Sequence, residues 1–254
     1  MKRFVPVAAF AICCVLLCLQ AGSVSAQKHN YLTANEKQHG WKLLFDGKTS
    51  DGWRSAKGDA FPAKGWEIKD GELTVLASEG KESQNGGDIV TDKQYSAFDL
   101  TFEFKLTPGA NSGVKYFVTL NEKTTGSAIG LEYQLLDDEL HPDAKLGRDG
   151  DRKLASLYDL IPSNKPASCI KPIGEWNVGR VVVYPNNHVV HYLNGVKVLE
   201  YMRGSKQFRD WVAISKFKVF PNFGEAKEGH ILLQDHGNRV SFRSIKIKEL
   251  KKSA

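Results

Sequence analysis

The feature that most constrains the fold is a strict two-residue alternation over residues 98–106. In the segment FDLTFEFKL, every even-numbered residue is apolar and every odd-numbered residue is polar. Because successive side chains of a β-strand point to opposite faces, this period predicts a strand with one buried face. The segment SGVKYFVTL, residues 112–120, repeats the pattern. Asp-Gly in KDGE and Asn-Gly in LNGV are typical of the turns that close β-hairpins.

The remaining segments extend this pattern to most of the chain. About a dozen short apolar or alternating runs are separated by turn residues, and helical turns are expected only near residues 33–39 and 205–211. The apolar positions in RVSFRSIKI change phase between residues 242 and 245, which predicts a β-bulge near residues 243–244. We therefore predict an all-β fold, an antiparallel double-sheet jelly roll or sandwich.

The N-terminus resembles a secretory signal peptide. Lys2 and Arg3 precede an apolar run, and Val24-Ser25-Ala26 forms a small-residue cleavage site. The apolar run is short for a membrane span, so we expect no stable membrane insertion after cleavage. We predict a signal peptide over residues 1–26, a single domain over residues 27–254, and export to the periplasm or the extracellular space.

Composition and motifs argue against several classes of protein. The net charge of +6 falls by two without Lys2 and Arg3, and the excess is dispersed, so nucleic-acid binding is not expected. Cys169 is the one cysteine outside the predicted signal peptide, which leaves no internal disulfide. The chain contains no Gly-rich phosphate loop, G-x-S-x-G, H-E-x-x-H or C-x-x-C motif. It also lacks the E-x-D-x-x-E spacing of many jelly-roll glucanases.

Polar residues on the predicted strands are the first candidates for a binding surface. We expect Glu103, Lys115, Glu132 and Gln134 to share one sheet face, which would form a ligand-accessible floor if the sheet is curved. The alternative is a solvent-exposed face with ion pairs between neighbouring strands.

Proton-handling residues gather where the strand LEYQLL ends. Asp137, Asp138 and His141 follow it directly, and loops at sheet ends often carry functional sites. A histidine near carboxylates can act as a general base oriented by an acid. The same three side chains could instead hold a divalent metal ion, or form a hydrated acidic loop. Their spacing does not choose among these possibilities.

A second polar cluster lies in the segment LLQDHGNRVSFR. Gln234 and His236 fall on one face of the predicted strand, where they could bind sugar hydroxyls or transfer protons. Trp176 could stack on a sugar ring, although core packing is the alternative for each tryptophan. Other polar candidates in turns and short apolar segments are Asn111, Tyr158 and Lys171.

Taken in order, these segments resemble the 3-keto-disaccharide hydrolase family. The resemblance covers nearly the whole chain after residue 26. It rests on GWKLLFDGKTSDGW, WEIKDGELTV, GGDIVTDKQYSAFDLTFEFKL, NSGVKYF, EYQLLDD, SLYDLI, GEWN, HYLNG and HILLQDHGNRVSFRSIKI. It implies a concanavalin-like jelly roll, which agrees with the strand pattern. The chain departs from the family pattern at Lys115, where an arginine is expected, and in the extended segment PSNKPASCIKP.

The resemblance also implies a reaction. A glycoside oxidised to a ketone at C3 carries an acidified hydrogen at C2. Removal of this proton gives an enolate, which can expel the C1 substituent, and addition of water completes a net hydrolysis. The implied partner is a 3-keto-glycoside or 3-keto-disaccharide, and the site needs a base, an oxyanion stabiliser and a proton donor.

Within this reaction, we expect His141 to be the base, oriented by Asp137 or Asp138. The enolate oxygen would be stabilised by Lys115, by Lys171 or by a bound divalent metal ion. The candidate proton donors for the leaving group are His236, Tyr158 and Glu132. The candidate ligands of the sugar hydroxyls are Gln134, Asn111 and Gln234. The alternatives are a non-catalytic glycan-binding module of the cell envelope and a structural or adhesion domain.

Overall fold

The computed structural model describes residue 1 and residues 28–79, 81–120 and 128–251. The predicted signal peptide and its cleavage site therefore lie, apart from Met1, outside the described residues. Within those described ranges, no helix is long and apolar enough to cross a membrane.

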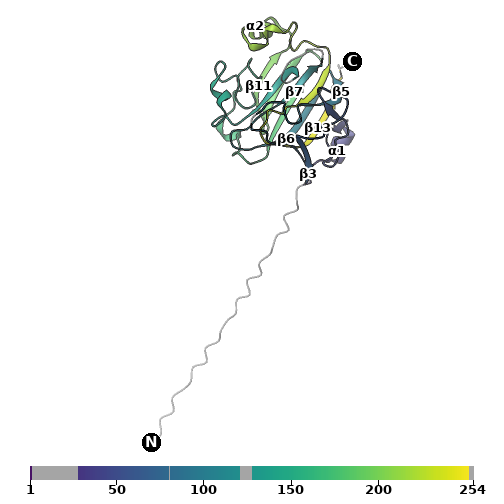
Figure 1. Ribbon diagram of the computed structural model, residues 1–254, viewed down its shortest axis with the longest axis vertical. Helices are drawn as coiled ribbons and strands as arrows, with labels where there is room; N and C mark the ends of the chain where they lie inside the picture. Colours follow the sequence, from purple (N-terminus) through teal and green to yellow (C-terminus); the bar gives the residue numbers. More distant parts are fainter. Residues whose placement is uncertain (2–27, 80, 121–127, 252–254) are drawn as a thin grey trace.

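The described residues form two packed antiparallel sheets, which confirms the predicted double-sheet fold (Figure 1). The larger sheet has the order β11-β10-β9-β6-β13-β4-β3, with β1 also paired to β13. The smaller sheet has the order β2-β5-β12-β7-β8. The strands are β1 (Trp41–Leu43), β2 (Trp53–Ser55), β3 (Trp66–Lys69), β4 (Glu72–Val75), β5 (Ile89–Tyr95), β6 (Phe98–Leu106), β7 (Asn111–Thr119), β8 (Ile129–Leu136), β9 (Asn177–Val183), β10 (His188–Leu193), β11 (Val196–Met202), β12 (Gly229–Leu233) and β13 (Val240–Glu249).

The helices are short; α1 precedes β1, and the others lie in the segments that connect strands. The two expected helical turns are present as α1 (Ala34–Gln38) and α2 (Lys206–Ile214), each begun by a capping hydroxyl. Three 3₁₀ helices follow loops: η1 (Pro142–Lys145), η2 (Ala167–Cys169) and η3 (Lys216–Val219). Of these elements, η1 and η3 form part of the site described below.

Turn chemistry and the bulge agree with the sequence predictions. Asp70-Gly71 joins β3 to β4, and Asn194-Gly195 joins β10 to β11, with positive φ at all four residues. In β13 the register shifts between Arg243 and Lys246, and the intervening Ser244 has a φ of 50°. This bulge keeps the apolar residues on both sides of it in the core.

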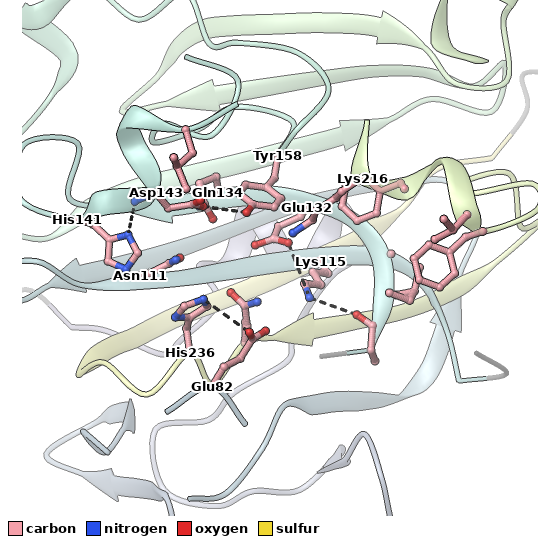
Figure 2. A pocket seen from close by; sticks show the side chains of 18 of the residues that line it. Glu82, Asn111, Lys115, Glu132, Gln134, His141, Asp143, Tyr158, Lys216 and His236 are labelled. Atoms are coloured by element: carbon pink, nitrogen blue, oxygen red, sulfur yellow. Dashed lines mark hydrogen bonds and ion pairs between the residues drawn. The ribbon is translucent and has the colours of Figure 1, made fainter. Parts of the chain in front are cut away.

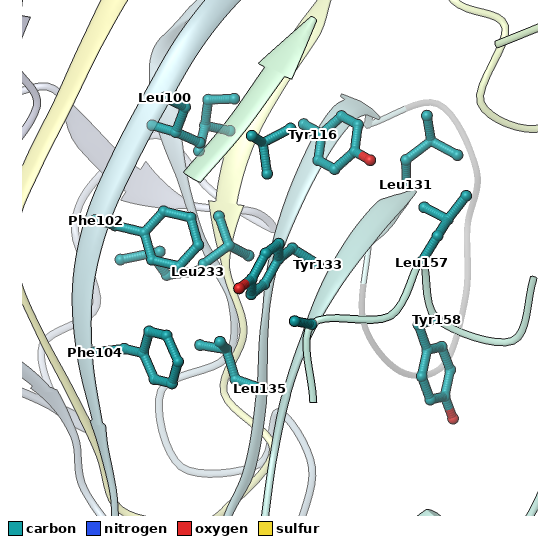
Figure 3. Packing of buried hydrophobic residues seen from close by; sticks show 14 of the residues in the cluster. Leu100, Phe102, Phe104, Tyr116, Leu131, Tyr133, Leu135, Leu157, Tyr158 and Leu233 are labelled. Carbon is teal, nitrogen blue, oxygen red and sulfur yellow. The ribbon is translucent and has the colours of Figure 1, made fainter. Parts of the chain in front are cut away.

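The core lies between the sheets and fixes which way the strands face (Figure 3). On β6, Phe102 meets Tyr133 of β8 edge-on, with ring centroids 5.4 Å apart. Leu131 and Leu135 flank Tyr133 in the same core cluster. Because side chains alternate along a strand, the polar residues between them point to the outer face of the smaller sheet.

One predicted grouping is wrong. Glu103 does not share a face with Lys115, because β6 belongs to the larger sheet and β7 to the smaller. On the outer face of the larger sheet, Glu103 instead accepts a hydrogen bond from Arg243, with Nε–Oε2 2.7 Å apart. The alternation correctly separates buried from outward residues, but it carries no information on which strands pair.

Candidate active site

A pocket of about 620 Å³ lies on the outer face of the smaller sheet (Figure 2). Its floor comes from β7, β8 and the residues that follow β12. Its walls come from the loop after β8, which contains η1, and from η3. This volume falls within the range of small-molecule sites, and many of the lining side chains are polar.

A buried acid and a buried base lie side by side in the floor. Lys115 and Glu132 are direct partners across β7 and β8, with Nζ and Oε2 3.7 Å apart. Lys115 Nζ also donates to the carbonyl of Ala128 at 3.2 Å. Gly113 leaves room for the carboxylate, because a Cβ there would lie 2.3 Å from Glu132 Oε1. The structure therefore brings Lys115 and Glu132 together as the shared-face prediction required.

Burial raises the pKa of the Glu132 carboxyl. The positive charges of Lys115, Lys216 and His236 act in the opposite direction and lower the pKa, but desolvation is the largest influence. A carboxylate whose pKa moves towards neutrality is a better proton acceptor at that pH than an ordinary surface glutamate. Glu132 thus has the environment of a general base.

Three amide side chains surround this pair. Asn111, Gln134 and Gln234 line the pocket and are each at most 5% exposed. Within the described residues, the side-chain oxygens of all three lack a hydrogen-bond partner. An amide offers both acceptors and donors, and a buried polar atom without a partner is costly. The arrangement suits a ligand that carries several hydroxyl groups.

His141 enters the pocket with its ring held by the backbone. Its Nδ1 accepts a hydrogen bond from the Asp143 amide at 3.2 Å, so the neutral ring carries its proton on Nε2. Burial and the neighbouring His236 lower the pKa of His141, which favours this neutral form. His141 therefore presents a donor to the pocket, whereas a base needs a free lone pair.

His236 lies beside His141, with ring centroids 5.8 Å apart. Its Nε2 is 3.8 Å from Glu82 Oε2, and its Nδ1 has no partner among the described residues. The pair can supply a proton donor next to the floor.

Tyr158 lines the pocket, but its hydroxyl is already engaged. It donates to Asp143 Oδ2 at 2.8 Å, while Arg152 Nη1 donates to Asp143 Oδ1 at 2.9 Å. Burial raises the pKa of Tyr158 well above its usual value. These contacts fix the Asp143 carboxylate next to the His141 ring and make Tyr158 a poor source of protons.

Lys216 is a pocket residue that the sequence analysis did not select. Its Nζ stands over the Tyr158 ring, 4.1 Å from the centroid. Although much of the residue is exposed, crowding of the side chain by protein atoms lowers the pKa of the ammonium. With Lys115, it places a second positive charge near Glu132 (Figure 2).

Glu82 and Asp143 were missed as well. Asp143 follows His141 by two residues in the HPD segment, and this spacing was a usable signal. Glu82 lies in a loop and Lys216 begins the short helix η3; neither segment shows a periodic pattern in the sequence, and only the folded chain brings the two residues to the same pocket.

The strand-exit carboxylates have other partners. Asp137 accepts hydrogen bonds from the amides of Gly109, Glu139 and Leu140. Asp138 accepts one from Leu154 and pairs with Lys165 at 3.0 Å. The expectation that one of them orients the His141 ring does not match this geometry, because the ring is held by the backbone amide of Asp143 instead.

The same contacts occupy the carboxylates that were expected to bind a metal ion. Asp137, Asp138 and His141 do not converge, and no group of three or more His, Cys, Asp or Glu side chains in the described ranges is arranged to hold a metal ion. The oxygens of both aspartates already accept hydrogen bonds or pair with a lysine, so these three residues do not fit a metal site.

Lys171 and Trp176 lie outside the pocket. Lys171 Nζ donates to the Trp176 carbonyl at 2.8 Å. The Trp176 ring is covered by Arg243 and Lys105, whose charged groups lie 3.8 Å and 4.6 Å from its centroid. Trp176 lies with Glu103 over the outer face of the larger sheet, so its ring does not face the pocket as a sugar-stacking platform. Lys171 lines a separate pocket with Asp137 and Asp138.

Comparison with known proteins identifies the family of the chain. Residues 40–248 match the family model of the 3-keto-alpha-glucoside-1,2-lyase-like domain. The chain belongs to this family. Over 249 residues it is 39% identical to a 3-keto-disaccharide hydrolase of Bacteroides thetaiotaomicron, covering 90% of this chain and 84% of the relative. Membership of this lyase-like family identifies the protein as an enzyme.

Solved structures of Parabacteroides distasonis proteins share the fold. One candidate glycosyl hydrolase superposes with a TM-score of 0.76 at 34% identity, covering 88% of this chain and all of that chain. A second superposes with a TM-score of 0.59 at 26% identity, covering 83% of this chain and 99% of that chain. These similarities support the two-sheet architecture over almost the full length of the family domain.

Proposed function

We propose that the protein hydrolyses 3-keto glycosides by elimination at C1 followed by hydration. The observation that carries the proposal is the buried Glu132 carboxylate, whose pKa is raised, flanked by Lys115 and Lys216. The unpartnered amides around it supply the contacts that a sugar requires. The family and the name of the Bacteroides relative support a ketone at C3 of the substrate.

In the first step, Glu132 removes the proton from C2. The C–H electron pair forms the C2–C3 double bond, and the carbonyl electrons move to O3. The resulting negative charge lies near the ammonium groups of Lys115 and Lys216. Positive charge placed in advance where an oxyanion develops is among the strongest contributions to catalysis.

In the second step, the enolate re-forms the C3 carbonyl and expels the C1 substituent. Protonated His236, held by Glu82, gives a proton to the departing oxygen, while His141 donates a hydrogen bond from Nε2. Water then adds its oxygen to C1 of the double bond and gives one proton to His236, which restores the charge of that ring. Glu132, whose carboxyl proton exchanges with solvent, delivers a proton to C2. The products are a free 3-keto sugar and the leaving alcohol, so atoms and charge balance.

This assignment reverses the roles expected from sequence for two residues. His141 was expected to be the base and Glu132 a proton donor. The hydrogen bond from the Asp143 amide occupies the lone pair of His141 Nδ1, whereas the Glu132 carboxylate faces an open pocket. The geometry therefore favours Glu132 as the base.

The test is incubation with a 3-keto glucoside and with its unoxidised parent, in deuterated water, followed by product analysis. Cleavage of the 3-keto compound alone, with deuterium at C2, is expected. Glu132→Gln should lose about 10²–10⁴-fold in turnover. Glu103→Gln makes the same change on the opposite side of the molecule and should retain activity.

Two results would contradict parts of the proposal. Near wild-type turnover by a folded Glu132→Gln protein would transfer the base role to His236. Cleavage of the unoxidised parent at a similar rate would remove the requirement for a C3 ketone, and with it the elimination mechanism.

A further inference from the structure

The rim of the pocket has an apolar part, in contrast to the floor, beside the exposed Lys216 of η3. Four hydrocarbon side chains line this part of the pocket: Leu146, Phe217, Val219 and Phe220. Leu146 is 56% exposed and Val219 is 68% exposed. A single surface aliphatic residue needs no explanation, but a shared apolar surface at the mouth of a polar pocket indicates a binding role.

The two segments that carry this rim are fastened to each other. Arg148 donates from Nη1 to the Ile214 carbonyl at 2.6 Å and from Nη2 to the Asp159 carbonyl at 3.1 Å. The Lys216 amide donates to Asp159 Oδ2 at 2.7 Å. The rim is therefore held in place before any ligand binds, which reduces the entropy cost of binding.

The backbone of the rim also offers few contacts to a polar ligand. The amide of Leu146 bonds to the Asp143 carbonyl at 3.0 Å, and the amide of Phe220 bonds to the Phe217 carbonyl at 2.9 Å. A hydroxyl group placed against this surface would lose hydrogen bonds to water without replacing them there. An apolar group would lose none and would bury carbon surface.

We propose that this rim is the leaving-group subsite and that it takes an apolar aglycone, aryl or alkyl, rather than a second sugar. The inference rests on the proposed function, because the floor must hold the 3-keto ring for the C1 substituent to reach the rim. A ring with oxygens on most of its carbons fits the amides of the floor. The remaining part of the substrate then lies between Leu146 and Val219.

The test uses 3-keto C-glucosides, in which the C1 substituent is attached by a carbon–carbon bond and is not expelled. The phenyl, methyl and C-linked glucosyl compounds are titrated calorimetrically into the wild-type protein. The phenyl probe should bind tenfold or more tightly than the other two, within the roughly 10–200-fold that apolar pocket contacts supply. The double variant Leu146→Ser/Val219→Ser should lose this preference and keep its affinity for the methyl probe.

Ile214→Ser is the matched control, because Ile214 is 61% exposed and precedes η3 but does not line the pocket. It should keep the phenyl preference. Tighter binding of the glucosyl probe, or equal binding of all three, would overturn the apolar subsite even if 3-keto glycosides are hydrolysed. A phenyl preference without hydrolysis would support the subsite and contradict the reaction, and failure to bind any probe would overturn both.

Discussion

A buried histidine beneath the site should make the protein lose stability in mild acid. His191 is fully buried between the sheets, where its Nε2 accepts from the Tyr116 hydroxyl at 2.7 Å. Its Nδ1 donates to the Ala155 carbonyl at 3.3 Å. The Ala155 amide in turn binds the Gln134 carbonyl, so the network supports the segment that leads to Tyr158.

Burial lowers the pKa of His191 from 6.5 to about 3. Between about pH 3 and pH 6.5, His191 is therefore mostly protonated in the unfolded chain and mostly neutral in the folded chain. The stability contribution is complete above pH 6.5 and is lost progressively between these values. At 1.36 kcal/mol per pKa unit, the loss is about 2 kcal/mol at pH 5 and approaches roughly 5 kcal/mol below pH 3.

Urea unfolding at pH 7.5 and pH 5 measures this effect. His191→Gln keeps a donor and an acceptor but cannot take up the proton. The fall in unfolding free energy between the two pH values should be about 2 kcal/mol larger for the wild type than for this variant. His188→Gln, at a partly exposed site on the surface, controls for loss of an imidazole. An equal pH dependence in wild type and His191→Gln would refute the reasoning.

Four further predictions concern the site and the chain ends. Gly113→Ala should lower turnover at least tenfold without unfolding the protein, because the new Cβ displaces the Glu132 carboxylate; steady-state kinetics and circular dichroism test this. Lys216→Gln should lower turnover. It should also remove the fall in turnover at alkaline pH, whose midpoint in the wild type is expected below the ordinary lysine pKa because the pKa of Lys216 is lowered. Because Asp137, Asp138 and His141 do not converge, Asp138→Asn should not change how turnover responds to chelation or to added divalent ions, and an altered response would contradict this. We also propose export with cleavage before Gln27, which N-terminal sequencing from the native host checks.

Local sequence patterns predicted the strands because their physical causes are local. The alternation in β6, the Asn-Gly turn before β11 and the phase change in β13 each depend on a few neighbouring residues. They also placed Glu132 and Gln134 on one face, opposite Tyr133. All of these features are present in the structure.

The errors concern contacts between distant segments. Glu103 was grouped with Lys115 because both are outward residues, but β6 pairs with β9 and β13 rather than with β7. Asp137 was selected for chemistry, yet its carboxylate satisfies three loop amides. Aspartate is common in loops for that reason, and sequence alone does not show which amides lack partners.

The position of the pocket explains why its residues look like ordinary surface residues in the sequence. Outward positions of a sheet normally face water, but here Lys115 and Glu132 are 5% and 6% exposed because the loops after β8 and around η3 cover them. Burying charges and leaving amide oxygens unpartnered lowers stability. A sequence keeps such costly groups mainly where function requires them. We therefore interpret the amide oxygens of Asn111 and Gln234, which lack partners among the described residues, as contacts for a hydroxylated ligand next to Glu132, the base that we propose.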